Sequence, residues 1–322
     1  MRAAQIGKIG EPPAVHELDR PARDAGAVLV AVKAVALNPL DIAVGGGRFY
    51  GGHPPLPYVP GCEAVGTVVG GDVLAEGARV YLFGGGLGVK RGGTLAELVA
   101  APADAVFSLP AEADEAVAVA CGCAGVAGWA ATTRRAAVGP DDTVLVLAAT
   151  GTVGSVALQA ARLRGARRIV AAGRRRDVLR RALGRGADAI VSLDDGDTLA
   201  ARLKEACGGD GPTVVIDPVW GAPLAAAVEA AAPRARVVNI GQSAAPETTL
   251  LSGTVRGKQL SILGYSNFAV ARDEFGSAYL ELLEHATAGR VELDVETFPL
   301  EDVSGAWNHQ SAGSGSKPVV IL

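Results

Sequence analysis

The chain has 322 residues, of which 49% are hydrophobic and 20% are charged, and this composition excludes an intrinsically disordered protein. The formal net charge of −4 argues against a dedicated nucleic-acid binder and against a basic membrane-surface protein, so small-molecule chemistry is favoured. The length exceeds what one hydrophobic core usually supports, and we therefore expect about two domains.

Three features of the sequence indicate where the protein resides. The N-terminal residues contain no apolar run of the kind that a secretory signal needs, so we expect a cytoplasmic protein. Residues 116–133 carry no charge and reach the length of a membrane helix. They consist mainly of small residues, with Trp129 as the one bulky side chain, and we interpret them as a tightly packed internal helix. The four cysteines are too few and too scattered for a secreted disulfide framework.

The first third of the chain is typical of a barrel-like β domain. Short apolar segments predict strands over residues 28–36, 64–69 and 78–83, and loops dense in Gly and Pro separate them. From residue 138 onward, apolar runs of strand length alternate with segments of helical length, which predicts a parallel sheet covered by helices on both faces. The expected strands are 143–149, 168–172, 189–193, 213–217, 236–240 and 259–264.

The last part of the chain returns to a β pattern. We expect a long helix over residues 272–288, followed by short strands and turns over residues 291–322. This tail could rejoin the first domain, which would make the α/β unit an insertion.

The strongest local signal is a motif of small residues between the apolar run 144–147 and the helical stretch 155–163. Small residues allow a sharp turn there, bring backbone N–H groups close to a pyrophosphate, and let the helix pack against the strand. The N-terminus of the helix adds a favourable partial positive charge. We therefore expect this motif to bind a dinucleotide; a strand, turn and helix without a ligand is the alternative. The motif consists of Ala149, Thr150, Gly151, Thr152, Val153 and Gly154.

The residues that follow the next strand indicate which dinucleotide is bound. That strand ends at Gly173, and Arg174-Arg175-Arg176 occupies the position where NAD-selective proteins place an acid for the ribose 2′-hydroxyl. A guanidinium can hold a 2′-phosphate through two parallel hydrogen bonds, whereas an acid would repel it. The sequence therefore favours NADP(H), with Arg174 and Arg175 as the phosphate-binding residues.

At this point the chain resembles the medium-chain dehydrogenase/reductase superfamily and, within it, the quinone oxidoreductase (zeta-crystallin-like) branch. The resemblance covers essentially the whole chain, and its features are specific because they occur together in a particular order and spacing. They are the motif above, Asn38-Pro39-Leu40-Asp41, Pro60-Gly61-Cys62-Glu63-Ala64-Val65-Gly66, Gly93-Thr94-Leu95-Ala96-Glu97, and Asp217 at the end of a strand.

The resemblance implies an α/β architecture in which a Rossmann domain, a doubly wound parallel sheet, is inserted in a GroES-like β-barrel catalytic domain. Residues 1–115 and 289–322 would form the GroES-like domain and residues 116–288 the NADP-binding domain. The resemblance also implies that cofactor and substrate bind in the cleft between the domains, and that two subunits pair through their sheets as a homodimer.

Zinc-dependent members of the superfamily use a Cys, a His and a second Cys, with a nearby Glu, to polarise the substrate oxygen. Here Asn38 stands at the first of these positions, Cys62 at the second, and only Cys123 near the third. An amide is a poor zinc ligand, so we expect no catalytic metal. Cys62, Glu63 and Cys123 leave open an unusual metal site or a redox-active thiol pair, with simple burial of small thiols as the alternative.

Without zinc, reduction has to rely on placing the nicotinamide against an electrophilic carbon and on hydrogen-bond donors for the oxygen that gains charge. Quinones and α,β-unsaturated carbonyl compounds suit that chemistry. In the resemblance, Asn38 sits beside the nicotinamide and Asp41 holds the loop. Tyr50 lies near the place of a cleft tyrosine in related reductases, one residue further from Asn38 than usual. It is a candidate proton donor, with packing as its alternative role.

Further candidate cofactor neighbours follow later strands. Open α/β sheets bind ligands at the carboxyl ends of their strands, and this places Gly241, Ser266 and Asn267 near the cofactor. The resemblance adds Asp217, and also Lys317, whose surrounding stretch approaches the cofactor in relatives; a solvated turn is the alternative for Lys317.

The sequence thus predicts a zinc-independent, NADPH-dependent reductase of quinones or α,β-unsaturated carbonyl compounds. Two other functions stay open. One is an alcohol or ketone oxidoreductase with an altered metal site at Cys62, Glu63 and Cys123. The other is a non-catalytic NADPH-binding protein, since zeta-crystallin-like relatives can accumulate for structural roles.

Overall fold

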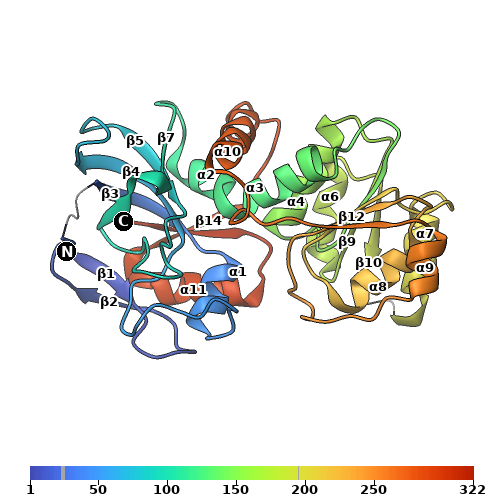
Figure 1. Cartoon of the computed structure of the whole chain (residues 1–322), viewed down its shortest axis with the longest axis horizontal. Helices are drawn as coiled ribbons and strands as arrows, with labels where there is room; N and C mark the ends of the chain where they lie inside the picture. Colours follow the sequence, from blue (N-terminus) through green and yellow to red (C-terminus); the bar gives the residue numbers. More distant parts are fainter. Residues whose placement is uncertain (23–25, 195) are drawn as a thin grey trace. The chain divides into compact units, whose positions relative to one another are not determined.

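The computed structural model describes residues 1–22, 26–194 and 196–322 and shows a chain divided into two compact units. The first unit comprises Met1–Cys123 and Tyr279–Leu322, and the second comprises Ala124–Ala278. The first unit is thus made from both ends of the chain, and the second is a continuous insertion (Figure 1). Compared with the expected division at 115/116 and 288/289, residues 116–123 and 279–288 lie with the first unit.

Within the described residues, the first unit is organised around a seven-stranded sheet of order β14-β15-β3-β4-β5-β7, in which β6 also pairs with β3. A separate small sheet joins β1 to β2. The strands are β1 (Arg2–Gln5), β2 (Ala14–Glu17), β3 (Ala27–Ala36), β4 (Glu63–Gly70), β5 (Arg79–Phe83), β6 (Leu98–Pro102), β7 (Val106–Ser108), β14 (Val295–Pro299) and β15 (Lys317–Ile321). The helices are α1 (Pro39–Gly45), α2 (Glu115–Ala120) and α11 (Val303–Ala312), with 3-10 turns at Ala103–Ala105 and Leu300–Asp302.

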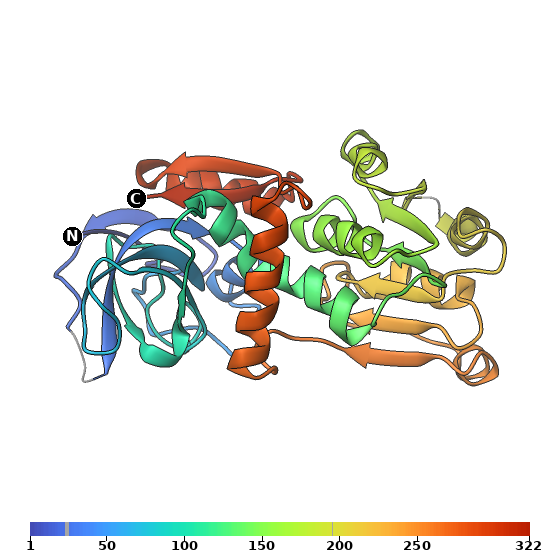
Figure 2. The ribbon, with the colours of Figure 1, turned by 90° about the horizontal axis from the view of Figure 1, so that it is seen from above.

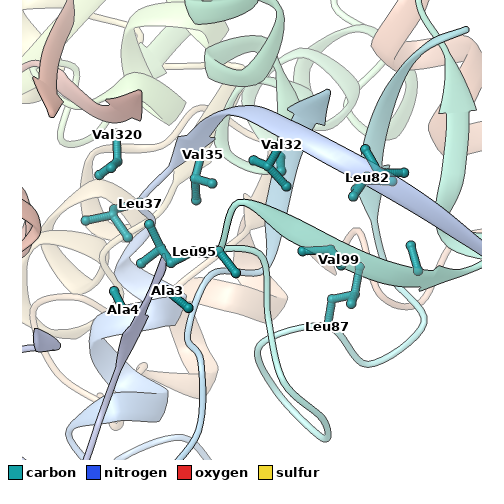
Figure 3. Close-up of a cluster of buried hydrophobic side chains, with 14 of the residues drawn as sticks. Ala3, Ala4, Val32, Val35, Leu37, Leu82, Leu87, Leu95, Val99 and Val320 are labelled. Carbon is teal, nitrogen blue, oxygen red and sulfur yellow. The ribbon is translucent and has the colours of Figure 1, made fainter. Parts of the chain in front are cut away.

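The long strand β3 is the centre of this sheet. Val28, Val30 and Val32 are buried and alternate with less buried residues, as the two-residue period of a strand requires. β3 pairs antiparallel with β4, β6 and β15, and irregularities in its register with β4 allow the sheet to curve. The labelled side chains that fill this core in Figure 3 are Ala3, Ala4, Val32, Val35, Leu37, Leu82, Leu87, Leu95, Val99 and Val320.

The C-terminal tail rejoins the first unit through β15, which lies between β14 and β3 in the sheet. The expectation of only strands and turns in this tail was wrong, because α11 occupies its middle. Val303, Ala306 and Trp307 are the buried face of this helix, at the three- and four-residue spacing of an α-helix. Asp302 caps it by accepting the Gly305 N–H. Gly, Ser and Asn residues with weak helix propensity obscure this pattern in the sequence.

Across the described residues of the second unit, six parallel strands form a sheet of order β10-β9-β8-β11-β12-β13. Numbered along the chain, this is the order 3-2-1-4-5-6, which confirms the predicted doubly wound sheet. The strands are β8 (Thr143–Val146), β9 (Arg168–Gly173), β10 (Ala189–Ser192), β11 (Val214–Asp217), β12 (Arg236–Asn239) and β13 (Ser261–Gly264). The helices of the unit are α4 (Thr152–Leu163), α5 (Arg176–Leu179), α6 (Arg181–Gly184), α7 (Leu199–Ala206), α8 (Gly221–Ala230) and α9 (Ser252–Gly257), with a 3-10 turn at Gly196–Thr198.

Helices cover both faces of this sheet (Figure 2). Successive residues of one strand face opposite sides. In β8, Val144 and Val146 therefore pack with α4 in one core, and Leu145 packs with α7 and α8 in the other. Strands buried on both faces explain the continuous apolar runs of the sequence. The predicted long helix is α10 (Arg272–Thr287), which begins in the second unit and ends in the first.

The apolar segment expected as one internal helix is interrupted near its start. α2 is followed by a π-helical turn (Cys121–Gly125), α3 (Val126–Ala130) and a second π-helical turn (Ala131–Arg135), and Gly122 has non-helical dihedral angles. Glu115–Arg135 is long and apolar enough to cross a membrane, yet 78% of its apolar window is buried inside the protein. Such burial supports the interpretation as an internal segment.

Candidate active site

A buried polar network in the first unit surrounds the carboxylate of Glu63, the first residue of β4. Glu63 is fully buried, and Asn38, Asp41 and Lys317 are each 2% exposed. Glu63 Oε1 accepts a hydrogen bond from Asn38 Nδ2 at 2.6 Å and lies 3.5 Å from Lys317 Nζ. Glu63 Oε2 accepts a hydrogen bond from Tyr81 Oη at 2.7 Å. Charges and amides buried this deeply need such partners, because their desolvation is otherwise uncompensated.

The same carboxylate explains why the apolar helical segment Glu115–Arg135 is broken at Gly122. Glu63 Oε2 accepts a hydrogen bond from the Cys123 N–H at 2.6 Å, so it caps the helical segment that begins after the break. A Cβ at position 122 would lie 1.9 Å from Glu63 Oε2, which leaves room only for glycine. Before the break, the Ala118 carbonyl accepts a hydrogen bond from Tyr279 Oη at 3.0 Å. Side chains therefore satisfy backbone groups on both sides of the break.

The orientation of the Asn38 amide follows from the charge of Lys317. An ammonium group can only donate, so the amide atom that lies 2.5 Å from Lys317 Nζ has to be the oxygen. The amide nitrogen consequently faces Glu63 Oε1 and, at 3.4 Å, Cys62 Sγ. Asn38 is thus held with its acceptor and its donor in fixed directions.

Asp41 is hydrogen-bonded to the backbone at the start of α1, where Asn38 lies. Asn38 is the N-cap of α1, Pro39 occupies the first helical position, and Asp41 Oδ2 accepts the Asn38 N–H at 2.7 Å. Asp41 Oδ2 also lies 3.8 Å from Cys62 Sγ, and Asp41 Oδ1 has no hydrogen-bond partner among the described residues. Burial raises the pKa of Asp41 to about 6, and the Glu63 charge adds to this effect, although the Asn38 N–H opposes it.

This raised pKa makes the stability of the protein depend on pH between about 4 and 6. The folded state holds the proton of Asp41 to a higher pH than the unfolded state, so ionisation of Asp41 lowers the free energy of unfolding as the pH rises through this window. When the pH is raised from 4 to 7.5, we expect the free energy of unfolding of Asp41→Asn to increase by roughly 2–3 kcal/mol relative to that of the wild type.

Denaturant titrations at several pH values measure this difference. Asp210→Asn, at an exposed turn, is the control and should follow the wild-type pH dependence. A constant difference between Asp41→Asn and the wild type across the window would show that Asp41 ionises normally.

The Cys62 and Cys123 thiols lie together beside the network. A hydrogen bond with the Cys123 side chain, together with burial, raises the pKa of Cys62 well above its usual value. Among residues 1–22, 26–194 and 196–322, no group of three or more His, Cys, Asp or Glu side chains could hold a metal ion. The described geometry therefore does not assemble the alternative metal site at Cys62, Glu63 and Cys123.

Tyr50, the candidate proton donor, is not part of the buried network. Its side chain is 90% exposed, in the turn after α1, and its ring lies 4.4 Å from that of Phe49. In the described part of the chain, its hydroxyl makes no hydrogen bond. The first unit thus brings together Asn38, Asp41 and Lys317 but leaves Tyr50 at the surface.

In the second unit, the predicted nucleotide motif forms the turn between β8 and α4. Gly151 is the N-cap of α4 and provides no side-chain acceptor for the N–H groups of the first helical turn. A Cβ at Gly154 would lie 2.4 Å from the Ala148 carbonyl oxygen, so glycine there permits close packing of helix on strand. A Cβ at Gly151 would instead meet only Ala148 O at 3.8 Å, which leaves open space at the turn. Uncapped N–H groups next to open space fit the diphosphate of a dinucleotide.

The arginines expected at the 2′-phosphate follow β9 directly and are exposed. Arg175 Nη2 lies 3.2 Å from Asp177 Oδ2, and this hydrogen bond lowers the pKa of Asp177. Arg174 makes no ion pair within the described residues. A phosphate would therefore compete with Asp177 for Arg175 but could bind Arg174 without displacing a carboxylate.

The other residues expected near the cofactor have structural partners of their own. Asp217 is fully buried, and its Oδ1 accepts the N–H groups of Val219 at 2.9 Å and Trp220 at 2.8 Å. Asn239 Nδ2 donates to Asp217 Oδ2 at 2.8 Å and to the Gly241 carbonyl at 2.7 Å. Asp217 thus shapes the loops at the carboxyl ends of β11 and β12, where doubly wound sheets bind ligands.

Two more of the expected cofactor neighbours lie just after β13, at the same edge of the sheet. Ser266 is exposed and its Oγ accepts the Phe268 N–H at 3.3 Å, while Asn267 is buried. They place polar groups at the edge predicted to bind the ligand, next to the loops that Asp217 shapes.

Several residues that build the network were not among the predicted site residues. The sequence marks Glu63 only within a family motif and as part of an open metal site, whereas the structure puts it at the centre of the network. Tyr81, Gly122 and Tyr279 gave no local signal, because their roles depend on contacts between distant segments. A glycine in the middle of an apolar helical stretch was the one available hint at Gly122.

Comparison with known proteins finds matches to each of the two units. A family model described as alcohol dehydrogenase GroES-like domain matches residues 24–111, and one described as zinc-binding dehydrogenase matches residues 152–285. The quinone oxidoreductases of Lama guanicoe and Homo sapiens are 27% and 26% identical; each alignment covers 100% of this chain and 97% of the relative.

A phenolphthiocerol/phthiocerol polyketide synthase chain of Mycobacterium tuberculosis is 27% identical over 95% of this chain, which spans only 14% of the length of that relative. Among solved structures, a NAD-dependent alcohol dehydrogenase is similar with a TM-score of 0.88 and 29% identity, and the alignment covers 100% of both chains. The Escherichia coli quinone oxidoreductase complexed with NADPH gives a TM-score of 0.87 and 25% identity, also over 100% of both chains.

These similarities agree with the two-unit architecture, the doubly wound sheet and the glycine-rich turn. The chain belongs to the medium-chain dehydrogenase/reductase superfamily, in its quinone oxidoreductase branch, and combines a Rossmann domain with a GroES-like domain.

Proposed function

We propose that this protein is an NADPH-dependent reductase of quinones or α,β-unsaturated carbonyl compounds that works without a catalytic zinc ion. The observation that carries the proposal is the buried network of Asn38, Glu63 and Lys317. Asn38 occupies a position where zinc-dependent relatives have a metal ligand, and Lys317 Nζ lies against its oxygen. An ammonium in contact with that oxygen repels a dication and blocks its coordination.

The cofactor proposal is supported by the turn between β8 and α4 and by the arginines after β9. The N–H groups of residues 149–154 would hold the diphosphate of NADPH, and Arg174 and Arg175 its 2′-phosphate. We propose Asp217, Gly241, Ser266 and Asn267 as further residues that bind or shape the cofactor site, whereas the buried Lys317, whose Nζ contacts Asn38 and Glu63, would act on Asn38 and not on NADPH. Bound NADPH would supply a hydride to the electrophilic carbon of the acceptor. The relative of known structure that was complexed with NADPH supports this choice.

In this proposal, Asn38 and Asp41 are catalytic-site residues that hydrogen bonds hold in a fixed geometry. Asp41 fixes the backbone of Asn38, and Lys317 and Glu63 fix its amide. A polar group held in one orientation before the reaction does not have to reorganise as charge develops on the acceptor, which is the advantage of a preorganised site. The exposed hydroxyl of Tyr50 is the proposed proton donor, and an unchanged kcat in Tyr50→Phe would remove it from the mechanism.

We also propose a cytoplasmic homodimer. Strand β13, at one edge of the sheet, has its residues largely exposed, including Ile262, and Phe268 close after it is 51% exposed. An open strand edge beside exposed apolar side chains is suited to pairing with a second copy.

The proposed function predicts NADPH consumption with a panel of quinones, enones and an enoyl thioester, and no loss of activity in EDTA. Removal of zinc together with activity would favour a metal-dependent alcohol or ketone oxidoreductase. Tight NADPH binding without turnover on the whole panel would favour a non-catalytic binding protein.

The same assay tests the arginines. We expect Arg174→Ala to raise KM for NADPH about tenfold or more, with little change in KM for NADH, because one charge-assisted phosphate contact is lost. Arg202→Ala, on helix α7, is the control of equal charge. Equal effects of Arg174→Ala on both cofactors would show that this residue does not read the 2′-phosphate.

A further inference from the structure

Lys317, the first residue of β15, brings a positive charge into the network around Glu63. Its side chain is 2% exposed, and its Nζ atom contacts Asn38 Oδ1 at 2.5 Å and Glu63 Oε1 at 3.5 Å. A buried ammonium without acceptors would be strongly destabilised, so these two contacts fix its position. The expected cofactor-binding role of Lys317 does not explain them.

Through Glu63, these contacts reach Cys123, where the N-terminal stretch of the first unit ends. Lys317 holds Asn38 and Glu63, and Glu63 in turn accepts the N–H of Cys123. Cys123 is the last residue of the first unit before the chain enters the second. The Lys317 ammonium therefore sets the direction of the Asn38 oxygen. It also balances the charge of Glu63, which caps the helical segment that leaves the unit.

We propose that Lys317 is a positioning residue for the reduction, and that its positive charge, rather than its size, sets the amide of Asn38 in the productive orientation. Without the ammonium, Asn38 Oδ1 loses its donor, and only the hydrogen bonds of Asn38 Nδ2 to Glu63 Oε1 at 2.6 Å and to the Ala36 carbonyl at 3.3 Å hold the amide in its direction. The buried Glu63 carboxylate also loses its counter-charge and becomes an unpaired buried charge. This inference rests on the proposed function, because it concerns the turnover of that site.

The test compares the thermal midpoint, the NADPH dissociation constant and kcat for the wild type, Lys317→Met, Glu63→Gln and the double variant. Lys317→Met leaves an unpaired buried carboxylate, so it should lower the thermal midpoint by several degrees. The double variant contains no buried charge at either position and should recover most of this loss.

The double variant separates stability from positioning. The glutamine introduced by Glu63→Gln can keep the hydrogen bonds from Tyr81 and the Cys123 N–H through its oxygen, while its amide nitrogen donates to Asn38 Oδ1. Asn38 Oδ1 would then have its donor in the reversed orientation of the amide. We expect a stable protein that binds NADPH with wild-type affinity and has a kcat lowered by about 100-fold.

Glu63→Gln alone keeps Lys317 against Asn38 Oδ1 and should retain a kcat at least about tenfold above that of Lys317→Met. This comparison decides the question even if the double variant does not fold. Recovery of kcat to within about threefold of the wild type in the double variant, or equal losses in the two single variants, would overturn the positioning role while leaving the proposed function intact. Absence of turnover in the wild type would overturn the proposed function and this inference with it.

Discussion

Replacement of Gly122 by alanine is expected to destabilise the first unit by about 3 kcal/mol or more. The added Cβ would lie 1.9 Å from Glu63 Oε2 and 2.4 Å from Tyr81 Oη, and neither group can move freely because both are buried. Relief of this clash requires the carboxylate to give up its hydrogen bond with the Cys123 N–H, which leaves a buried donor without a partner. The same displacement disturbs Asn38, so kcat should fall together with stability.

Thermal and denaturant unfolding, with NADPH turnover on the same preparation, measure this effect. Gly92→Ala is the matched control in the same unit, because a Cβ there meets nothing within 4 Å and the backbone conformation suits alanine. Wild-type stability of Gly122→Ala would mean that the helix does not pass as close to Glu63 as the structure shows.

The two glycines of the nucleotide turn are expected to respond to alanine in opposite ways. Gly154→Ala places a Cβ 2.4 Å from Ala148 O and 2.7 Å from Ala149 Cα, which should cost about 2–3 kcal/mol of stability through overpacking of helix on strand. Gly151→Ala meets nothing closer than 3.8 Å and has extended backbone angles that alanine adopts easily. Its stability should therefore change by less than about 0.5 kcal/mol.

NADPH affinity should be lowered in Gly151→Ala, the variant whose stability hardly changes. A methyl group at Gly151 stands in the open space where the diphosphate would approach the backbone, so we expect the dissociation constant to rise about tenfold or more without unfolding. Gly139→Ala, in an open loop before β8, is the control for both measurements. Unchanged NADPH affinity in Gly151→Ala would show that the diphosphate does not bind at this turn.

Much of the fold could be predicted because its signals are local. The apolar runs of β8 to β12, the small-residue turn and the long helix α10 are each encoded within a few neighbouring residues, and the observed elements differ from the expected ones mainly at their ends. α11 was missed because its buried face is short and lies among weak helix formers. The helix break at Gly122 was missed because its cause, Glu63, lies on another strand.

The candidate site could be predicted only in part for the same reason. Asn38 and Asp41 lie within one turn of helix, so their shared motif marked both of them. The contact between Lys317 and Asn38 joins residues 279 positions apart, and no periodicity or spacing in the sequence indicates it. The side chain of Tyr50 had a plausible position along the chain but is exposed, which only the folded structure could show.

The division of the first unit between two separate stretches of chain has a consequence for biosynthesis. The second unit is continuous, so it can fold on the ribosome once residue 278 has emerged. The first unit cannot close its central sheet until β15 is made, because β3 stays without that neighbour and Glu63 without its ammonium. Nascent chains stalled before Lys317 should therefore carry a folded insertion beside a β sheet with an open, aggregation-prone edge.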